Sequence, residues 1–346
     1  MSSERVPSGN PDDALIASLV RAIDEVLEPL VPRGEDVALV DFPQSPNVGD
    51  SVIWLGTLAW LERSGRGAPR HVCSGGTYRR AALARSLERG GTILLGGGGN
   101  FGDLYESHQR LREQVVADFP DRRIVQLPQS IHFHSGEALA RARGVLDRHP
   151  ALTLLVRDRA SLALARAEFR TPSRLCPDMG LALGSLPRPV PATRPVVWLS
   201  RADKEALPEE PFEPPAGVVR LDWLRDDPSP LLRVHVAISR QLRHRAELRS
   251  WLAPWLTATF APVARRRLER GTRVLAAGEV VVTNRLHGHV LSLLLGIPHW
   301  FVDNSYGKVR SFHETWTHAS ELAHLCETQA SALRRALAAT GRPPRG

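Results

Sequence analysis

Lysine is nearly absent from this sequence. Of the 45 basic residues in a chain of 346, only Lys204 and Lys308 are lysines, and all the others are arginines. Arginine and lysine differ in hydration, in geometry and in how easily their pKa is shifted. Because the chain uses arginine almost everywhere, we expect these two lysines to lie where a compact ammonium group is required.

Asparagine is also scarce. The chain has five asparagines, and four of them stand in polar turns that contain glycine: Asn47, Asn100, Asn284 and Asn304. Asparagine favours turns in any protein because it tolerates left-handed backbone conformations. The clustering therefore indicates either binding loops or ordinary turn chemistry.

Cysteines and long apolar runs are few. The three cysteines, Cys73, Cys176 and Cys326, are far apart and form no CxxC pair, so we expect reduced thiols and no metal site. The first thirteen residues are polar, and no apolar run approaches the about 20 residues that a bilayer span needs. We therefore expect a cytoplasmic protein.

The net charge of +8 raises the question of an anionic partner. No DNA- or RNA-reading motif accompanies the arginines, so we expect no nucleic-acid partner. The arginine-rich helices expected over residues 231–270 are typical of solvated helix faces. They would also suit peripheral contact with an anionic membrane at the inner face of the cell.

Strand and helix patterns alternate along the chain, which predicts parallel α/β sheets. Expected strands cover residues 36–42, 70–73, 92–95, 123–127, 152–156, 173–176, 196–200, 218–223, 280–282 and a short stretch after Pro298. Expected helices cover residues 14–31, 51–65, 79–88, 104–118, 136–148, 159–169, much of 231–270 and 320–339. Asp50 is the expected N-cap of the second helix.

The length favours two domains of roughly 150 residues each. Residues 185–195 contain four prolines and no periodicity, which is typical of a linker. The predicted division is a tail and helix at 1–34, a first domain at 35–185, a linker at 186–195, a second domain at 196–317 and a helix with a tail at 318–346.

The stretch from Val280 to Lys308 is the most informative motif. Three valines lead into Thr-Asn-Arg-Leu-His-Gly-His (residues 283–289), then into a helical run and a second strand. Ligands of open α/β sheets bind at the carboxyl ends of the strands, where this turn would place Asn284, Arg285 and His287 beside a helix N-terminus. Such a cluster suits an anion. His289 reads as a structural residue of the helix.

Four glycines follow the third strand, in the segment 96–103. Their amides could cradle an anion, or the glycines could allow a strand to pack tightly against a helix. No acidic residue that could hold a ribose follows at the required distance, so a nicotinamide cofactor is not favoured. Polar residues end the later strands as well, at Gln129-Ser130, Arg157-Asp158 and Pro177-Asp178.

These motifs resemble the polysaccharide pyruvyl transferase family. The resemblance rests on Asn-Val-Gly-Asp at 47–50, the glycine segment, Leu-Pro-Gln-Ser at 127–130, Pro-Asp at 177–178, Arg-Leu-His-Gly at 285–288 and Asp-Asn-Ser-Tyr-Gly-Lys at 303–308. It covers roughly residues 35–317. It implies two Rossmann-like doubly wound domains that face a cleft, as in GT-B glycosyltransferases. It also implies transfer of the carboxyethylidene group of phosphoenolpyruvate onto two hydroxyls of a sugar in exopolysaccharide or cell-surface glycan biosynthesis.

The resemblance assigns the donor site to the second domain. Phosphoenolpyruvate is a small trianion, and we expect these residues to bind it: Arg201, Lys204, Asn284, Arg285 and Lys308. His287 is the candidate acid or phosphate-binding group, and Asp203 or Glu205 would take protons from the sugar hydroxyls. Arg201 and Asp203 could instead form only an ion pair. Phosphoenolpyruvate serves as a co-substrate, and no further cofactor is expected.

The acceptor, a sugar or a lipid-linked oligosaccharide, is expected at the loops of the first domain: Asn47, Gly49, Asp50, Gly97, Gly98, Asn100, Asp103 and Gln129. Asp50 could instead be merely a helix cap. Two other functions fit the same fold, because a fold does not determine a function. One is a GT-B-like glycosyltransferase that uses a nucleotide sugar, and the other is a non-catalytic saccharide-binding or assembly protein. The oligomeric state is left open.

Overall fold

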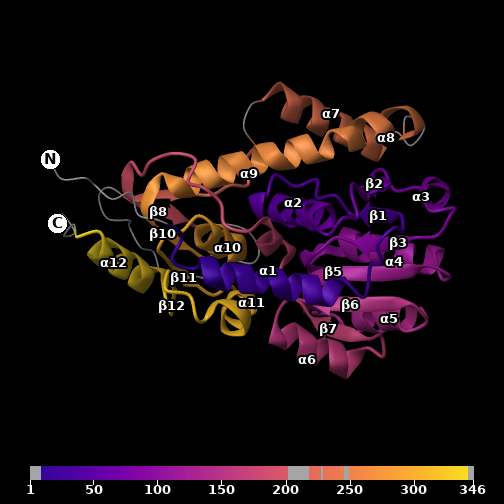
Figure 1. The fold of residues 1–346 in the computed structure, drawn as a ribbon, viewed down its shortest axis with the longest axis horizontal. Helices are drawn as coiled ribbons and strands as arrows, with labels where there is room; N and C mark the ends of the chain where they lie inside the picture. The colour runs from indigo at the N-terminus through magenta and orange to yellow at the C-terminus, as the bar shows by residue number, and fades with distance from the viewer. Residues whose placement is uncertain (1–8, 202–217, 227–228, 245–248, 342–346) are drawn as a thin grey trace. The chain divides into compact units, whose positions relative to one another are not determined.

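The computed structural model describes residues 9–201, 218–226, 229–244 and 249–341. These residues form two compact units. The first consists of Arg21–Leu183 with Leu224–Leu268, and the second of the described parts of Met1–Val20, Gly184–Trp223 and Glu269–Gly346. Each unit combines distant stretches of the chain, whereas the predicted domains were continuous in sequence. We call them the seven-stranded and the five-stranded unit after their sheets (Figure 1).

The sheet of the seven-stranded unit has the order β2-β1-β3-β5-β6-β7, with β4 paired to β5. Its strands are β1 (Val37–Val40), β2 (His71–Cys73), β3 (Thr92–Leu95), β4 (Gly98–Gly102), β5 (Arg123–His132), β6 (Leu152–Val156) and β7 (Ser173–Leu175). Its helices include α2 (Val48–Arg63), α3 (Arg80–Ser86), α4 (Glu106–Asp118), α5 (Gly136–Leu146) and α6 (Arg159–Glu168). All of its strand pairings are parallel.

Both faces of this sheet are covered. Ala38 and Val40 of β1 belong to a core that includes residues of α3, α4, α5 and α6, and the alternate residues Val37 and Leu39 are also buried. Successive side chains of a strand point to opposite faces, so burial of all four requires cover on both sides. The short runs of β-branched and aliphatic residues are typical of such central parallel strands.

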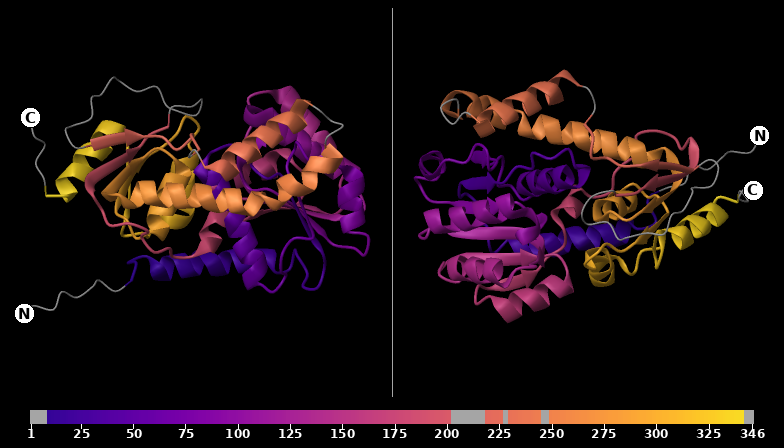
Figure 2. Two further views of the ribbon diagram at one scale, coloured as in Figure 1. Left: turned by 90° about the horizontal axis from the view of Figure 1, so that it is seen from above. Right: turned by 180° about the vertical axis from the view of Figure 1, so that it is seen from behind.

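The sheet of the five-stranded unit has the order β12-β11-β10-β8-β9 and is also parallel. Its strands are β8 (Arg194–Leu199), β9 (Val218–Leu221), β10 (Gly278–Thr283), β11 (His299–Val302) and β12 (Ala323–Cys326). Its helices are α10 (Leu286–Leu294), α11 (Lys308–Phe312) and α12 (Gln329–Ala339). α12 packs across one face of the sheet (Figure 2). Every residue of α10 is buried.

Three more helices follow β9, and two helices cross the limits of the units. The three helices after β9 are α7 (Pro230–His244), α8 (Arg249–Ala258) and α9 (Phe260–Ala276). The first helix of the described chain is α1 (Asp13–Leu27). The unit limits fall inside α1 and α9. No helix in the described part of the chain combines the length and apolar composition that a membrane span requires.

The predicted alternation of strands and helices is confirmed, with four local corrections. Residues 98–102 form strand β4 instead of a loop, and residues 323–326 form strand β12 instead of the start of the last helix. β5 continues to His132, so Gln129 and Ser130 lie inside this strand instead of after it. The N-cap of α2 is Asn47, whose side chain accepts a hydrogen bond from the Gly49 amide, and Asp50 lies inside the first turn. The cap lies three residues earlier because the helix begins at Val48.

Candidate functional site

Each sheet has one point where the strand order reverses. In the five-stranded sheet this switch point lies between β8 and β10, because the chain passes from β8 to β9 on one side and from β10 to β11 and β12 on the other. In the seven-stranded sheet it lies between β1 and β3. Parallel sheets of this kind bind ligands beyond the carboxyl ends of the strands at the switch point. The sequence places its polar motifs at both of these points.

Arg201 and Asn284 meet at the switch point of the five-stranded sheet. Arg201 follows β8, and its backbone N–H donates to the side-chain oxygen of Asn284, which follows β10, at 2.8 Å. Both residues are buried. The rare asparagine therefore joins the ends of the two central strands, and Arg201 is held at the edge where the sequence predicted it.

Arg285 is oriented by a carboxylate that sequence reasoning missed. Its Nε donates to Oδ1 of Asp222 at 3.0 Å, and its Nη2 donates to Oδ2 at 2.9 Å. Asp222 directly follows β9, so a third strand contributes to this edge. Such a two-point pair fixes the plane of a guanidinium group as well as its position. A single aspartate after a short strand gives no sequence signal for this role.

The turn that contains His287 is packed closely against β10. His287 lies in the first turn of α10 and is buried. The next residue must be small, because a Cβ atom on Gly288 would lie 2.4 Å from Oγ1 of Thr283. The same Oγ1 accepts a hydrogen bond from the Arg285 amide at 3.0 Å. The Arg-Leu-His-Gly motif therefore holds an arginine and a histidine at the start of a buried helix.

Lys308 is the first residue of α11 and follows the turn that comes after the next strand, β11. Its ammonium group donates to the Tyr306 hydroxyl at 2.8 Å and lies 5.0 Å from the centre of the same ring. Its backbone N–H donates to Asn304, and Oδ1 of Asp303 accepts hydrogen bonds from the amides of Asn304, Val309 and Arg310. This turn fixes the second rare lysine in a buried position.

Four predicted residues thus follow the carboxyl ends of the neighbouring strands β8 and β10: Arg201, Asn284, Arg285 and His287. Lys308 comes after the turn that follows β11, the next strand of the sheet. Their parts in binding or catalysis stay predictions. The remaining predicted residues of this site, Asp203, Lys204 and Glu205, lie outside the described residues.

His289 has the structural place that its sequence context indicated. It is fully buried in a chain of hydrogen bonds that joins His299, Thr317 and His313. Its pKa is lowered well below the ordinary value, chiefly by burial, with a further effect of the neighbouring histidines. A neutral, fully enclosed histidine of this kind stabilises α10.

The switch point of the seven-stranded sheet holds an Asp–His pair that the sequence did not predict. Asp41 follows β1 with a φ of 77°, a left-handed conformation that aspartate adopts more readily than most residues. Its two carboxylate oxygens lie 2.9 and 2.8 Å from Nδ1 of His108 on α4. The Asp41 carboxylate raises the pKa of His108 against the opposing effect of burial. The pair joins residues 67 positions apart, which no local pattern reveals.

The glycine segment is held by amide side chains. Gln129 donates from Nε2 to the Gly96 carbonyl and to Oδ1 of Asn100, both at 2.8 Å, and its Oε1 accepts from the Asn100 amide. Arg112, which is buried, donates from Nη2 to the same Asn100 oxygen at 2.8 Å. Burial lowers the pKa of Arg112 to about 10, so it stays charged at neutral pH. Predicted residues Asn100 and Gln129 thus form one network around the segment.

Close packing explains several of the glycines. A Cβ atom on Gly102 would lie 1.7 Å from the His132 carbonyl oxygen, and one on Gly97 would lie 2.9 Å from the Pro128 carbonyl oxygen. Gly102 also has a φ of 131°. Both oxygens belong to β5, so the closest packing at these two positions is against a strand, whereas the sequence had suggested packing against a helix. Gly98 has a positive φ of 133° at the start of β4.

Three other predicted residues of this unit have structural partners. Asp50 accepts a hydrogen bond from the Ser45 hydroxyl at 2.9 Å. Asp103 accepts hydrogen bonds from the amides of His134 and Ser135, which lower its pKa although partial burial opposes them. Gly49 donates its amide to Asn47, as the cap of α2.

The later strand ends of this sheet form a buried polar network. Arg157 pairs with Asp178 at 2.7 Å, and its Nε donates to Ser130, whose hydroxyl donates to Asp158. The network joins residues that follow β6 (Arg157, Asp158) and β7 (Asp178), as the sequence predicted, to Ser130, which lies inside β5. Within the described ranges, no group of three or more histidine, cysteine, aspartate or glutamate residues could hold a metal ion.

Comparison with known families decides what this arrangement belongs to. The model of the polysaccharide pyruvyl transferase family matches residues 47–306, which is most of the chain. The chain belongs to the polysaccharide pyruvyl transferase family. The match begins at the Asn47 cap, after β1, and ends in the turn before Lys308, so it includes β8 and β10 on both sides of the switch point of the five-stranded sheet.

Two relatives agree with this assignment, and one solved structure shares the fold. Pyruvyl transferase 1 of Schizosaccharomyces pombe is 32% identical over 302 residues, which cover 83% of this chain and 71% of that protein. EpsO of Bacillus subtilis (strain 168) is 31% identical over 301 residues, with 86% and 90% covered. An uncharacterized protein of Klebsiella pneumoniae, KP1_0663, superimposes with a TM-score of 0.59 at 15% identity over 90% of this chain and 99% of that one. That likeness concerns the fold alone.

Proposed function

We propose that this member of the family transfers the carboxyethylidene group of phosphoenolpyruvate onto two hydroxyls of a sugar, and releases phosphate. The acceptor is a sugar or a lipid-linked oligosaccharide of exopolysaccharide or cell-surface glycan biosynthesis. The observation that carries this proposal is the group of Arg201, Arg285, His287 and Lys308, which are buried in the segments that follow three adjacent strands of one sheet. The GT-B-like arrangement of the two units belongs to the same proposal.

The charges of this group suit phosphoenolpyruvate. A carboxylate and a phosphate on one small molecule carry up to three negative charges, and guanidinium groups bind both by two-point hydrogen bonds. Arg285 is already held in one plane by Asp222, so its orientation does not have to be acquired on binding. Groups ordered in advance lose less conformational entropy when a ligand arrives.

The chemistry requires one proton for carbon and two hydroxyl groups. The methylene carbon of phosphoenolpyruvate takes a proton and becomes a methyl group, one sugar hydroxyl attacks the neighbouring carbon, and phosphate leaves. The second hydroxyl then attacks the same carbon and closes the ketal. The two hydroxyl protons balance the one added to carbon and the one released with phosphate. His287 would supply the proton or bind the phosphate, and Asp203 or Glu205 would take hydroxyl protons.

The Asp41–His108 pair is our candidate for contact with the acceptor in the seven-stranded unit. A histidine that is oriented by a carboxylate through one ring nitrogen presents its other nitrogen in a defined direction. Such a nitrogen can hydrogen-bond a sugar hydroxyl. The predicted acceptor residues of the same unit are Asn47, which caps α2, Asn100 in β4 and Gln129 in β5.

The test is product formation from phosphoenolpyruvate and a panel of sugars, including p-nitrophenyl glycosides and lipid-linked oligosaccharides. We expect phosphate release, together with the mass of a ketal on the acceptor. Arg285→Ala and His287→Ala should each lower kcat/KM at least about 100-fold, because each removes a charge or proton donor from the reacting centre. Arg33→Gln, which removes an exposed ion pair with Glu28 in the seven-stranded unit, is the matched control.

Two outcomes would contradict the proposal. If an active preparation kept its turnover in both the Arg285 and the His287 variants, the donor site would be wrong. If no acceptor yielded phosphate while a nucleotide sugar was consumed, the reaction itself would be wrong, and a glycosyltransferase would be the better assignment.

A further inference from the structure

Helices α7 and α8 carry all of the large apolar side chains that are exposed in the described part of the chain. Trp251 and Trp255 of α8 are 84% and 42% exposed, and Val234 and Val236 of α7 are each 44% exposed. The other side of α7 is buried through Leu232, His235, Ser239 and Leu242, which recur at helical spacing. α7 also packs against α8, so the exposed residues belong to a packed pair of helices.

The two tryptophans share one face of α8. They are four residues apart, so they lie one above the other along the helix. Exposing two indole groups to water is unfavourable at about 25 cal/mol for each Å² of apolar surface. Exposed apolar clusters of this kind mark interaction sites in soluble proteins.

Positive charge is concentrated in the same part of the chain. Residues 230–268 contain eight arginines, no lysine and one acidic residue, Glu247, which gives a net charge of +7. The whole chain has a net charge of +8, so the remaining residues together contribute only +1. The distribution is therefore strongly uneven, although the overall composition hides it.

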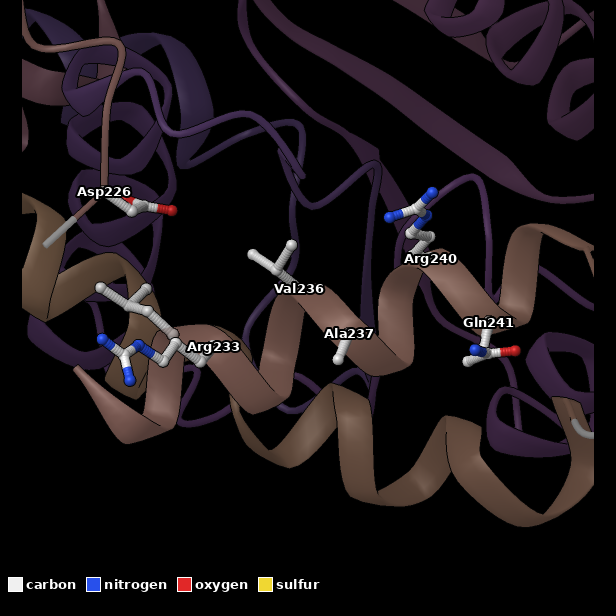
Figure 3. Close-up of a pocket in the computed structure, with 7 residues that line it drawn as sticks. Asp226, Arg233, Val236, Ala237, Arg240 and Gln241 are labelled. Atoms are coloured by element: carbon white, nitrogen blue, oxygen red, sulfur yellow. The ribbon is translucent and has the colours of Figure 1, made fainter. Parts of the chain in front are cut away.

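Two of these arginines are exposed beside the apolar residues. Arg233 and Arg240 of α7 line an open pocket of about 730 Å³ together with Val236, Ala237 and Gln241, and Asp226 lies at one end (Figure 3). Both arginines are exposed to solvent. Asp226 is engaged with the buried Arg267 through two hydrogen bonds, at 3.0 and 2.9 Å. The negative charge of Asp226 is therefore neutralised by Arg267 and not by Arg233 or Arg240.

We propose that this face, formed by Arg233, Val234, Val236, Arg240, Trp251 and Trp255, docks on the surface of an anionic phospholipid bilayer. Indole rings favour the level of the lipid headgroups, with the apolar ring inward and the N–H toward water. Arginines beside them bind the phosphate groups, and each is attracted by the negative surface potential. The aliphatic Val234 and Val236 favour lipid over a nucleic acid, which offers them no apolar partner. The proposal does not rest on the proposed catalytic function.

The direct test is co-sedimentation of the full-length protein with lipid vesicles. We expect binding to phosphatidylcholine vesicles that contain about 30% phosphatidylglycerol, little binding to pure phosphatidylcholine, and weaker binding as salt is raised. The double variant Arg233→Gln with Arg240→Gln should bind about 25-fold more weakly, since each guanidinium near an anionic surface contributes about a fivefold effect. Trp251→Ala with Trp255→Ala should weaken binding about tenfold or more.

The matched control is a variant that loses two exposed arginines in another part of the chain. Arg85 and Arg89 are exposed in the region of α3, and the variant Arg85→Gln with Arg89→Gln should bind within about twofold of wild type, because only charges close to the lipid surface are attracted. Circular dichroism and the urea midpoint should be unchanged in all three double variants, since every substituted side chain is exposed.

Several results would overturn the proposal. Equal binding to neutral vesicles, equal loss in the Arg85/Arg89 control, or unchanged binding in the tryptophan variant would each do so. A tryptophan variant that converted a dimer to a monomer on size exclusion would show that a second copy of the chain covers this face. Binding of the protein to RNA, together with no binding to vesicles, would identify this face as a nucleic-acid surface instead.

Discussion

At the scale of single residues, the carboxylate of Asp222 orients the guanidinium group of Arg285. Replacing Asp222 with asparagine keeps the volume of the side chain but removes the negative charge that orients the guanidinium group. We expect the KM for phosphoenolpyruvate to rise about tenfold with a smaller change in kcat, because ground-state binding is weakened while the proton donor stays in place. Steady-state kinetics with varied phosphoenolpyruvate measure both parameters.

The control for this prediction is Asp24→Asn. Asp24 also pairs with an arginine, Arg63 at 3.0 Å, but both side chains are more than a third exposed and belong to the seven-stranded unit. We expect its kinetics to match those of wild type. An Asp222→Asn enzyme with an unchanged KM would show that Arg285 does not need this partner.

The second prediction at the residue scale concerns the Asp41–His108 pair. Asp41 raises the pKa of His108, so Asp41→Asn should lower that pKa. The raised pKa also implies that this pair stabilises the fold fully below about pH 6.5, and that this contribution is lost as the pH rises through the pKa of the folded protein. NMR titration of the His108 ring gives the pKa directly. A pKa that stayed the same in the variant would contradict the pairing.

At the scale of elements, the contact between α10 and β10 depends on a glycine. A Cβ atom on Gly288 would meet Oγ1 of Thr283 at 2.4 Å and Cδ2 of Leu199 at 3.0 Å. Both neighbours are buried, so the helix has to shift to make room. We expect Gly288→Ala to lower the free energy of unfolding by about 1–3 kcal/mol, as overpacking in a core does. Urea denaturation measures this loss.

Gly144 in α5 is the matched control for that substitution. A Cβ atom there would have no neighbour within 4 Å. Alanine is a better helix former than glycine, so Gly144→Ala should stabilise the protein by up to about 1 kcal/mol. If the two variants changed stability equally, close approach of α10 to β10 would not be the reason for the glycine in Arg-Leu-His-Gly.

At the scale of the whole molecule, buried histidines make stability depend on pH. The Ile297 carbonyl can only accept, so His299 Nδ1 donates to it, and His299 Nε2 accepts from His289 Nδ1. His289 Nε2 then accepts from the Thr317 hydroxyl, which in turn accepts from His313. This chain is complete only when His289 and His299 are neutral, because each must accept a hydrogen bond at Nε2. Burial accordingly lowers the pKa of His299 to about 3 and that of His313 to about 4.

The direction of the pH effect follows from these pKa values. Below about pH 6.5 the histidines of the unfolded chain take up protons, while those of the folded protein do not. Stability should therefore fall as the pH drops from about 6.5 toward about 3, by about 1.4 kcal/mol per pH unit for the fully buried His299. Urea titrations at several pH values test this. In the His299→Gln variant the free energy of unfolding should depend less steeply on pH. In the variant His134→Gln, where the side chain is exposed, the dependence should be the same as in wild type.

Which parts of this protein could be predicted depended on the range of the interactions. The strands around the two switch points were predicted because parallel central strands need short apolar runs that end in polar turns, and these patterns are local. β4 was missed because four glycines lack the β-branched signal, and only pairing with β5 makes the segment a strand. β12 was missed because its sequence, Ala-His-Leu-Cys, continued a helical pattern until edge pairing with β11 decided otherwise.

The sequence by itself determined the family, the parallel α/β class and the strand-end positions of Arg201, Asn284, Arg285, His287 and Lys308, because each of these is written in contiguous motifs. Only the tertiary structure decided the partners that orient such groups: Asp222 for Arg285 and Asp41 for His108. It also decided that Leu224–Leu268 pack with the seven-stranded unit. Contacts between residues tens of positions apart depend on how the elements pack, and no local periodicity encodes that packing.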